Sequence, residues 1–208
     1  IDNAYTVSSS IANYYQNKYG IHMLVVRNVP IMKKIKLKIN SKKYKRIIYQ
    51  GAVNKDRGVD LMIKSMSYID NAKLYIVGGG DLINEMMELV TILKLEDKVV
   101  FLGQVHFNEL FDITRDCDLG LSFESNTCFA YKFSLPNKIF DYINAEIPVL
   151  ISDLPEFKNI IKHYELGAVL VHRDPKLVAV QVQKILSAPK DKWMLAINKA
   201  KKELCWNR

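Results

Sequence analysis

A short segment in the second half of the chain combines residue types that suit the binding of a phosphate. It runs from Ser134 through Pro136 to Asn137, and a predicted helix after it carries Lys138 and Asp141. Pro136 suits the first position of that helix, where its missing N–H costs nothing. Backbone N–H groups and the helix dipole at such a start favour a phosphate by about 0.3–1 kcal/mol when exposed. The segment therefore predicts a diphosphate site, although an ordinary capped helix in an α/β domain would show the same pattern.

The elements that must position these residues begin near residue 46, where apolar runs alternate with segments of helical spacing. Strands are predicted over residues 46–50, 73–77, 99–102, 118–122, 148–152 and 168–171. Helices are predicted over 59–66, 82–93, 106–115, 154–163, 176–186 and 191–205, besides the helix with Lys138, and a long loop is expected from 122 to 136. Because a helix follows each apolar strand, the fold class is α/β, with a doubly wound, Rossmann-like parallel sheet from about residue 45 to 190.

Ligands of such sheets bind beyond the carboxyl ends of the strands. The loops at those ends lie at Gly51, at residues 78–80, at 103–105 and at 124–136. The predicted diphosphate site belongs to the last of these loops, so it lies at the edge of the sheet where a ligand is expected.

The first 30 residues form a separate pattern. A strand is predicted from Ala4 to Ser8, a helix from there to about Lys18, and a second strand from His22 to Val26. This βαβ piece is too small to hold a core of its own and needs a neighbouring sheet. Unpaired strand edges favour association, so residues 1–30 are expected to mediate a homodimer.

The net charge of +8 has a local origin. Eight basic side chains and no acidic one lie between Lys33 and Arg46, and this segment is interpreted as a solvated linker. It also suits contact with an anionic membrane surface, at about 1 kcal/mol per basic residue near the lipid. Aromatic residues do not alternate with the basic ones, so nucleic acid is not an expected partner.

Other features of composition exclude whole classes of protein. No apolar run approaches the ~18 residues that a membrane span requires, and no secretory signal opens the chain. The three cysteines form no CxxC pair, and the four histidines form no HxH or HExxH motif. A disulfide scaffold and a metal site are therefore not expected. The expected location is the cytoplasm, with the basic segment at the inner face of the membrane.

Five segments, taken in order, resemble the C-terminal, donor-binding half of a retaining family 4 glycosyltransferase, a group 1 glycosyl transferase with the two-domain GT-B fold. They match the family's first loop, its second and third strand ends, its signature helix in a Ser-Leu-Pro-Asn-Lys version and a recurring Pro-Glu. The matching segments are residues 50–60, 76–80, 100–105, 134–148 and 154–156. Tyr5 to Ser8 and the following helix resemble the end of the family's N-terminal domain.

The resemblance divides the chain into three parts. Residues 1–30 are a remnant of the N-terminal, acceptor-binding domain, residues 31–45 are the basic linker, and residues 46–208 are the nucleotide-sugar-binding Rossmann-like domain. A start without Met also indicates an excised fragment. Such a fragment is expected to bind a nucleotide without transferring sugar.

By resemblance, two catalytic residues stabilise the leaving diphosphate. Arg57 stands where the family has a lysine that grips the pyrophosphate, and its guanidinium can bind phosphate through two hydrogen bonds. Ala52 stands where the family usually has an arginine, and Lys138 is the candidate replacement from across the cleft. Asp141 stands at the second glutamate of a Glu-x7-Glu pattern, which holds the ribose hydroxyls.

The first glutamate of that pattern falls on Phe133, which departs from the family. Glu124, in the same long loop, is the candidate to reach the donor sugar in its place, or else a solvated loop acid. The nucleobase is expected near Gln104 and Val105. The remaining substrate-binding candidates are Gly51, Ser134 and Asn137.

The resemblance implies a hexosyltransferase-type enzyme that binds a nucleoside-diphosphate sugar. The sugar passes, with retention, to a glycan or lipid-linked acceptor in polysaccharide biosynthesis, and neither a metal nor a cofactor is implied. Two alternatives stay open. One is a nucleotide-sugar epimerase of the same fold, and the other is a non-catalytic module that binds nucleotides, or anionic lipid through Lys33 to Arg46.

Overall fold

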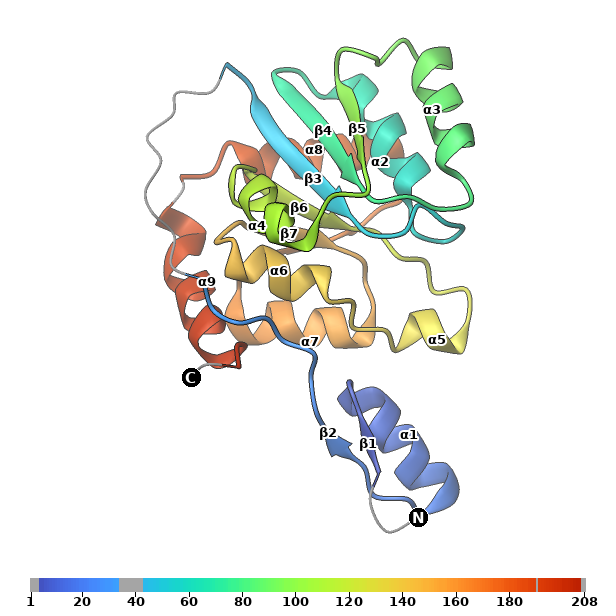
Figure 1. Cartoon of the computed structure of the whole chain (residues 1–208), viewed down its shortest axis with the longest axis vertical. Helices are drawn as coiled ribbons and strands as arrows, with labels where there is room; N and C mark the ends of the chain where they lie inside the picture. The colour runs from blue at the N-terminus through green and yellow to red at the C-terminus, as the bar shows by residue number, and fades with distance from the viewer. Residues whose placement is uncertain (1–3, 34–42, 190, 207–208) are drawn as a thin grey trace.

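A computed structural model of the chain describes residues 4–33, 43–189 and 191–206. Most of them belong to a layered α/β body with a central parallel sheet (Figure 1). The prediction of a Rossmann-like α/β fold is confirmed.

Six strands form the sheet, and every neighbouring pair is parallel. They are β3 (Lys45–Gln50), β4 (Ala72–Val77), β5 (Val99–Gly103), β6 (Leu119–Ser122), β7 (Val149–Ile151) and β8 (Gly167–Val169). Their spatial order is β5-β4-β3-β6-β7-β8, so the chain reverses direction across the sheet between β3 and β6. Ligands of open α/β sheets bind at the carboxyl ends of the strands beside such a reversal.

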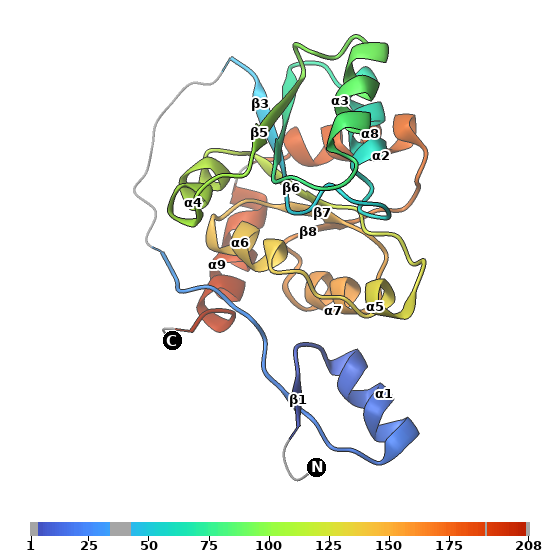
Figure 2. The ribbon, with the colours of Figure 1, turned by 45° about the vertical axis from the view of Figure 1, so that its right-hand side comes forward.

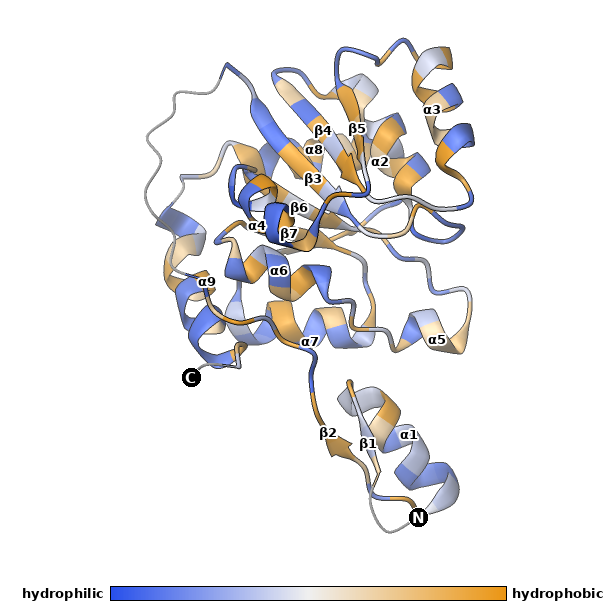
Figure 3. Ribbon diagram, in the orientation of Figure 1, coloured by the Kyte–Doolittle hydropathy of each residue, from blue (hydrophilic) through white to orange (hydrophobic). Residues whose placement is uncertain are grey.

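Helices cover both faces of the sheet (Figures 1 and 2). One core cluster lies beneath α2 (Val59–Ser65), the 3₁₀ turn η1 (Met66–Tyr68), α3 (Ile83–Ile92) and α8 (Pro175–Leu186). The other lies beneath α4 (Phe107–Arg115), α6 (Lys138–Asn144), α7 (Pro155–Tyr164) and α9 (Asp191–Glu203). With both faces covered, most residues of the strands are apolar, and the hydropathy colouring shows much of the sheet in orange, although β3 begins with hydrophilic residues (Figure 3).

Local signals explain where the elements begin. In β3, Ile47, Ile48 and Tyr49 are fully buried, which fits a continuous apolar run in a central strand. Asp174 caps α8 by accepting hydrogen bonds from the N–H groups of Lys176 and Leu177, both at 3.0 Å, and a proline follows the cap.

The predicted βαβ piece near the N-terminus is also confirmed. Strands β1 (Tyr5–Thr6) and β2 (Leu24–Val25) pair in parallel and flank α1 (Ser9–Tyr19), in a unit beside α5 and α7 and outside the six-stranded sheet (Figures 1 and 2). The N–H of Ser10 donates to the Glu156 carboxylate on α7 at 2.7 Å. The Ser8 hydroxyl donates to the carbonyl of Phe133 at 3.2 Å. The predicted homodimer through this unit stays a prediction.

The part of the linker that the structure describes lies against the body. Asn144, at the end of α6, donates to the carbonyl of Ile31 and accepts from the N–H of Lys33, each at 3.1 Å. Residues 34–42 of the predicted basic segment lie outside the described residues. No helix in the described part of the chain is long and apolar enough to cross a membrane.

Two local predictions were wrong. The expected long loop contains a one-turn helix, α5 (Phe129–Lys132), which packs the Phe129 ring edge-on to Phe133 at 4.8 Å. Helix α6 begins only at Lys138, so Pro136 lies before the helix, where its carbonyl accepts from the N–H of Ile139 at 3.2 Å. The proline therefore shapes a turn that leads into the helix.

Candidate functional site

A cleft of about 510 Å³ opens at the carboxyl ends of β3, β4 and β5. The loops after these strands form one side of it, and the start of α6 forms the other. Seven of the candidate catalytic and substrate-binding residues line this cleft: Gly51, Arg57, Gln104, Val105, Asn137, Lys138 and Asp141. The fold thus brings together residues from loops far apart in the chain at the strand-order reversal.

A buried carboxylate lies next to the two cations of the cleft. Glu124, which directly follows Phe123 after β6, has no exposed surface and accepts from the Lys138 ammonium at 2.6 Å. The same carboxylate oxygen lies 3.7 Å from the Arg57 guanidinium. Its other oxygen accepts from the Ser122 hydroxyl at 2.6 Å. One carboxylate therefore holds two cations and is itself held by β6.

Burial and the neighbouring charges shift the pKa of both Glu124 and Lys138. Burial alone would raise the pKa of the Glu124 carboxyl, but the Lys138 charge and the hydrogen bonds from Lys138 and Ser122 hold that pKa below its usual value. Burial lowers the pKa of the Lys138 ammonium, and the Glu124 carboxylate opposes that shift. A carboxylate and an ammonium in direct contact each stabilise the charged form of the other.

The Lys138 side chain lies across Gly51 and against β3. Its ammonium lies 4.3 Å from the centre of the Tyr49 ring, and the Tyr49 hydroxyl donates to the carbonyl of Ala52 at 2.7 Å. Gly51 has a φ of 137°, and a Cβ there would lie 3.4 Å from Cε of Lys138. Glycine at this position lets the backbone turn and the lysine pass over it.

Asp141 is held by a chain of hydrogen bonds that begins on α4. The Thr114 hydroxyl donates to the Gln50 side-chain carbonyl at 2.9 Å, and the Gln50 amide donates to the Asp141 carboxylate at 2.8 Å. Burial raises the pKa of Asp141 to about 6, while the hydrogen bond from Gln50 and the charge of Lys33 oppose the rise. The carboxylate lines the cleft, where it can accept from hydroxyl groups of a ligand.

Arg57 is held in place by an aromatic ring from the loop after β6. Its guanidinium lies 4.9 Å from the centre of the Tyr131 ring on α5. Such stacking orients a guanidinium without consuming its hydrogen-bond donors. Arg57 can therefore present N–H groups to an anion in the cleft.

The structure does not bring every predicted residue to the cleft surface. Glu124 lies beneath the cations and not along the cleft wall, and Ser134 donates its hydroxyl to the carbonyl of Tyr131 at 2.9 Å. Position 133, where the family has a glutamate, holds a phenylalanine, and its ring packs against Phe129. Ala52 lines the cleft without a charge.

Sequence reasoning missed Gln50, Thr114 and Tyr131. Gln50 ends a buried strand, and a polar residue at the carboxyl end of such a strand is a signal that could have pointed to it. Thr114 and Tyr131 give no comparable signal, because their roles arise only when α4 and α5 fold against the loops of the sheet.

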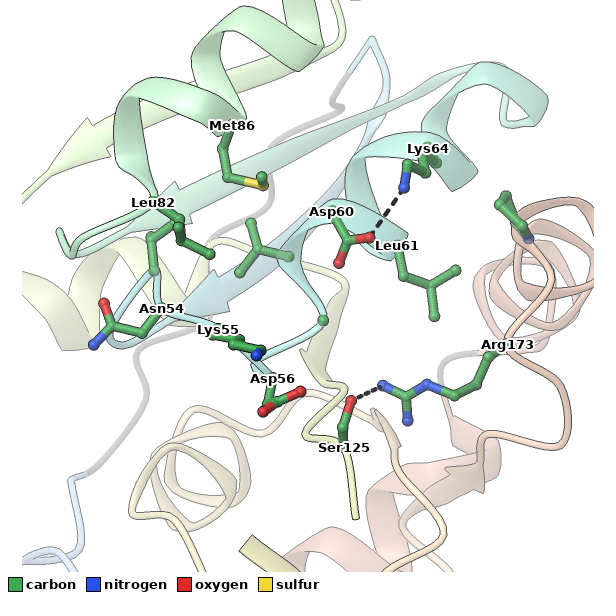
Figure 4. A pocket seen from close by; sticks show the side chains of 14 residues that line it. Asn54, Lys55, Asp56, Asp60, Leu61, Lys64, Leu82, Met86, Ser125 and Arg173 are labelled. Carbon is green, nitrogen blue, oxygen red and sulfur yellow. Dashed lines mark hydrogen bonds and ion pairs between the residues drawn. The ribbon is translucent and has the colours of Figure 1, made fainter. Parts of the chain in front are cut away.

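A second pocket, of about 580 Å³, lies on the other side of the loop between β3 and α2 (Figure 4). Its lining includes positively charged lysines and negatively charged aspartates. Arg173, from the loop before α8, points toward Ser125. Within the described parts of the chain, no group of three or more His, Cys, Asp or Glu side chains could hold a metal ion.

The chain resembles known glycosyltransferases in sequence and in fold. It is 28% identical over 146 residues to an uncharacterised glycosyltransferase of Methanocaldococcus jannaschii, a match that covers 69% of this chain and 36% of that protein. Anabaena HepE, solved in complex with UDP and glucose, superposes with a TM-score of 0.80 at 13% identity, covering 98% of this chain and 59% of HepE. WaaG, a glycosyltransferase involved in lipopolysaccharide biosynthesis, superposes with a TM-score of 0.73 at 15% identity, covering 95% of this chain and 58% of WaaG.

The two structural matches confirm that the chain has the fold of part of a GT-B glycosyltransferase. The chain spans about a third of the length of the archaeal relative and less than two thirds of each solved protein. Residues 32–203 match the family model described as "Glycosyl transferases group 1", which covers most of the sequence. On this evidence the chain belongs to the group 1 glycosyltransferases.

Proposed function

We propose that the cleft binds the nucleoside diphosphate of a sugar donor, and that the full-length protein transfers the sugar of that donor. The observation that carries this proposal is the meeting of Arg57, Lys138 and Asp141 in one cleft at the strand-order reversal. HepE, a protein of the same fold, was solved with UDP and glucose, which supports a nucleotide-sugar ligand.

Each part of the donor has chemically suitable neighbours in this cleft. Arg57 and Lys138 face the diphosphate, whose charge they complement. Asp141 accepts hydrogen bonds from the ribose hydroxyls, which its carboxylate suits. The base lies toward Gln104 and Val105, on the loop after β5.

The proposed reaction breaks the bond between the anomeric carbon of the sugar and the diphosphate oxygen. Negative charge then collects on the leaving diphosphate, and the two cations stabilise it without having to reorganise. No side chain is assigned as a nucleophile. We propose that an acceptor hydroxyl oxygen bonds to the anomeric carbon on the face that the diphosphate leaves, which retains the configuration, and that the hydroxyl proton passes to the departing phosphate oxygen. Arg57 and Lys138 also supply the charge that a metal ion would otherwise provide.

We further propose that this chain is the donor-binding part of a longer enzyme. Residues 46–208 would form the donor domain, and residues 1–30 would complete an N-terminal domain that binds the acceptor. The share of each relative that the chain spans supports this division. The chain alone is then expected to bind nucleotide but not to transfer sugar.

The acceptor that we propose is a glycan or lipid-linked glycan made at the cytoplasmic side of a membrane. WaaG, which shares the fold, acts in lipopolysaccharide biosynthesis and supports such a product. The basic residues from Lys33 to Arg46 would hold the enzyme near anionic lipid.

The test is calorimetric titration of the 208-residue chain with UDP, GDP and ADP. We expect one of them to bind, and Arg57→Ala to weaken that binding about 10–100-fold, because a hydrogen bond to a charged group contributes roughly 1.5–3 kcal/mol. Lys64→Ala is the matched control, since it removes a cation from α2 that does not line the cleft. Failure of all three nucleotides to bind, or equal effects of the two substitutions, would contradict the proposal.

A further inference from the structure

We propose that Glu124 is a positioning residue, which holds Arg57 and Lys138 side by side for the donor diphosphate, and that Arg173 fixes Glu124 in turn. This inference rests on the proposed function, since it names the residues that arrange the same cleft. Neither Glu124 nor Arg173 lines that cleft, so both would act through other residues.

Both carboxylate oxygens of Glu124 have partners in the structure. One oxygen contacts the Lys138 ammonium at 2.6 Å and the Arg57 guanidinium at 3.7 Å, and the other accepts from Ser122. The side chain is fully buried, so it cannot reach a ligand without breaking these contacts. A contact with the donor sugar, which the sequence suggested, is therefore less consistent with the structure than a supporting role.

Electrostatics explains why the site needs such a residue. Arg57 and Lys138 are two like charges that approach one shared oxygen atom, and Lys138 is buried. Without an anion between them, the two cations would repel each other, and the buried ammonium would lose its proton readily. The carboxylate keeps both groups charged and leaves one net positive charge for the diphosphate.

Arg173 holds the backbone on which Glu124 sits. Its guanidinium donates to the carbonyl of Phe123, to the carbonyl of Glu124 at 3.4 Å and to the Ser125 hydroxyl at 3.1 Å. Figure 4 shows the Arg173 side chain pointing toward Ser125 at the second pocket. Three consecutive residues are thus fixed by one planar group, which limits the positions that the Glu124 side chain can take.

The experiment compares wild type and Glu124→Gln in nucleotide binding between pH 7 and 8.5, with whichever of UDP, GDP and ADP binds best. The charged and titratable groups that face Lys138 in the described structure are Glu124, Arg57 and Tyr49. The glutamine keeps the size of the side chain but removes its charge, so only burial and the Arg57 charge would then act on the pKa of Lys138, and both lower it. We expect the affinity of the variant, relative to wild type, to fall about tenfold as the pH rises.

The role of Arg173 is tested with Arg173→Met and Arg173→Lys. The methionine should weaken nucleotide binding several-fold, and the lysine, which can still donate to a carbonyl, should recover part of the loss. Lys176→Met removes an exposed cation nearby and should have no effect. Wild-type nucleotide affinity in Arg173→Met would overturn the proposed role of Arg173.

A cycle of stability measurements needs no ligand. Glu124→Gln, Lys138→Met and the double variant are compared by urea unfolding, and the double variant should lose less stability than the two single variants together, because it leaves neither charge unpaired. Additive losses would overturn the inference, as would a Glu124→Gln variant with wild-type affinity and pH profile. If wild type binds no nucleotide, the proposed function fails, while the cycle still tests the Glu124–Lys138 pair.

Discussion

The raised pKa of Asp141 predicts that replacing this carboxylate makes the protein more stable. Burial raises the pKa from 3.8 to about 6, so the folded state binds a proton more tightly than the unfolded state does. The carboxylate is ionised in both states above pH 6, and there its burial costs the most stability. As the pH falls from about 6 toward 3.8, the folded state takes up the proton first and this cost disappears.

The size of the effect follows from the shift. Each pKa unit corresponds to about 1.4 kcal/mol, and since Asp141 is only partly buried, we expect Asp141→Asn to gain roughly 1–3 kcal/mol at pH 7.5. The asparagine carbonyl can still accept from Gln50, so the hydrogen-bond chain is kept. At roughly 2–4 °C per kcal/mol for a domain of this size, the melting temperature should rise by several degrees.

Thermal unfolding at pH 7.5 and at pH 4.5 measures this change, with Asp97→Asn as a control on an exposed acid. The gain of Asp141→Asn should be present at pH 7.5 and should shrink at pH 4.5. The same variant should bind nucleotide more weakly if Asp141 holds the ribose. A loss of stability at pH 7.5, or a gain of equal size at both pH values, would refute the reasoning.

Two further substitutions test other parts of the structure. Gly51→Ala forces a side chain into a left-handed backbone position next to Lys138 and should cost about 1–2 kcal/mol in urea unfolding. Gly79→Ala, whose Cβ would meet only the Gln104 side chain, should cost less, and equal costs would argue against backbone strain at Gly51. Glu156→Ala leaves the N–H of Ser10 without its partner, so amide hydrogen exchange should accelerate more in α1 than in β3 and β4. A uniform change across the chain would show that Glu156 does not hold the N-terminal βαβ unit locally.

The sequence predicts the sheet well because its strands are short apolar runs and its helices are amphipathic. Each predicted strand of the sheet exists, and the expected βαβ unit at the N-terminus pairs in parallel. The missed helix α5 is a single turn with three apolar or aromatic residues in four, too short to show a period. The start of α6 was misplaced because a proline that suits a first helical turn also suits the turn before it.

The site is less predictable than the fold. The resemblance to a family identifies Arg57 and Asp141 by position, and both line the cleft. It does not identify the contact between Glu124 and Lys138, because that contact depends on β6 placing its end beside α6. An acidic residue directly after a buried strand is common, and only its burial against two cations distinguishes this one.

The hydrogen bond between Gln50 and Asp141 joins residues that are 91 positions apart, and the cleft as a whole is lined by residues from this span of the chain. Contacts of this kind require long loops to close before they gain any stability. A partly formed sheet, with β3 and β4 paired but β6 still absent, would lack part of the lining of the cleft. Nucleotide binding during refolding would therefore report that all the loops of the cleft have come together.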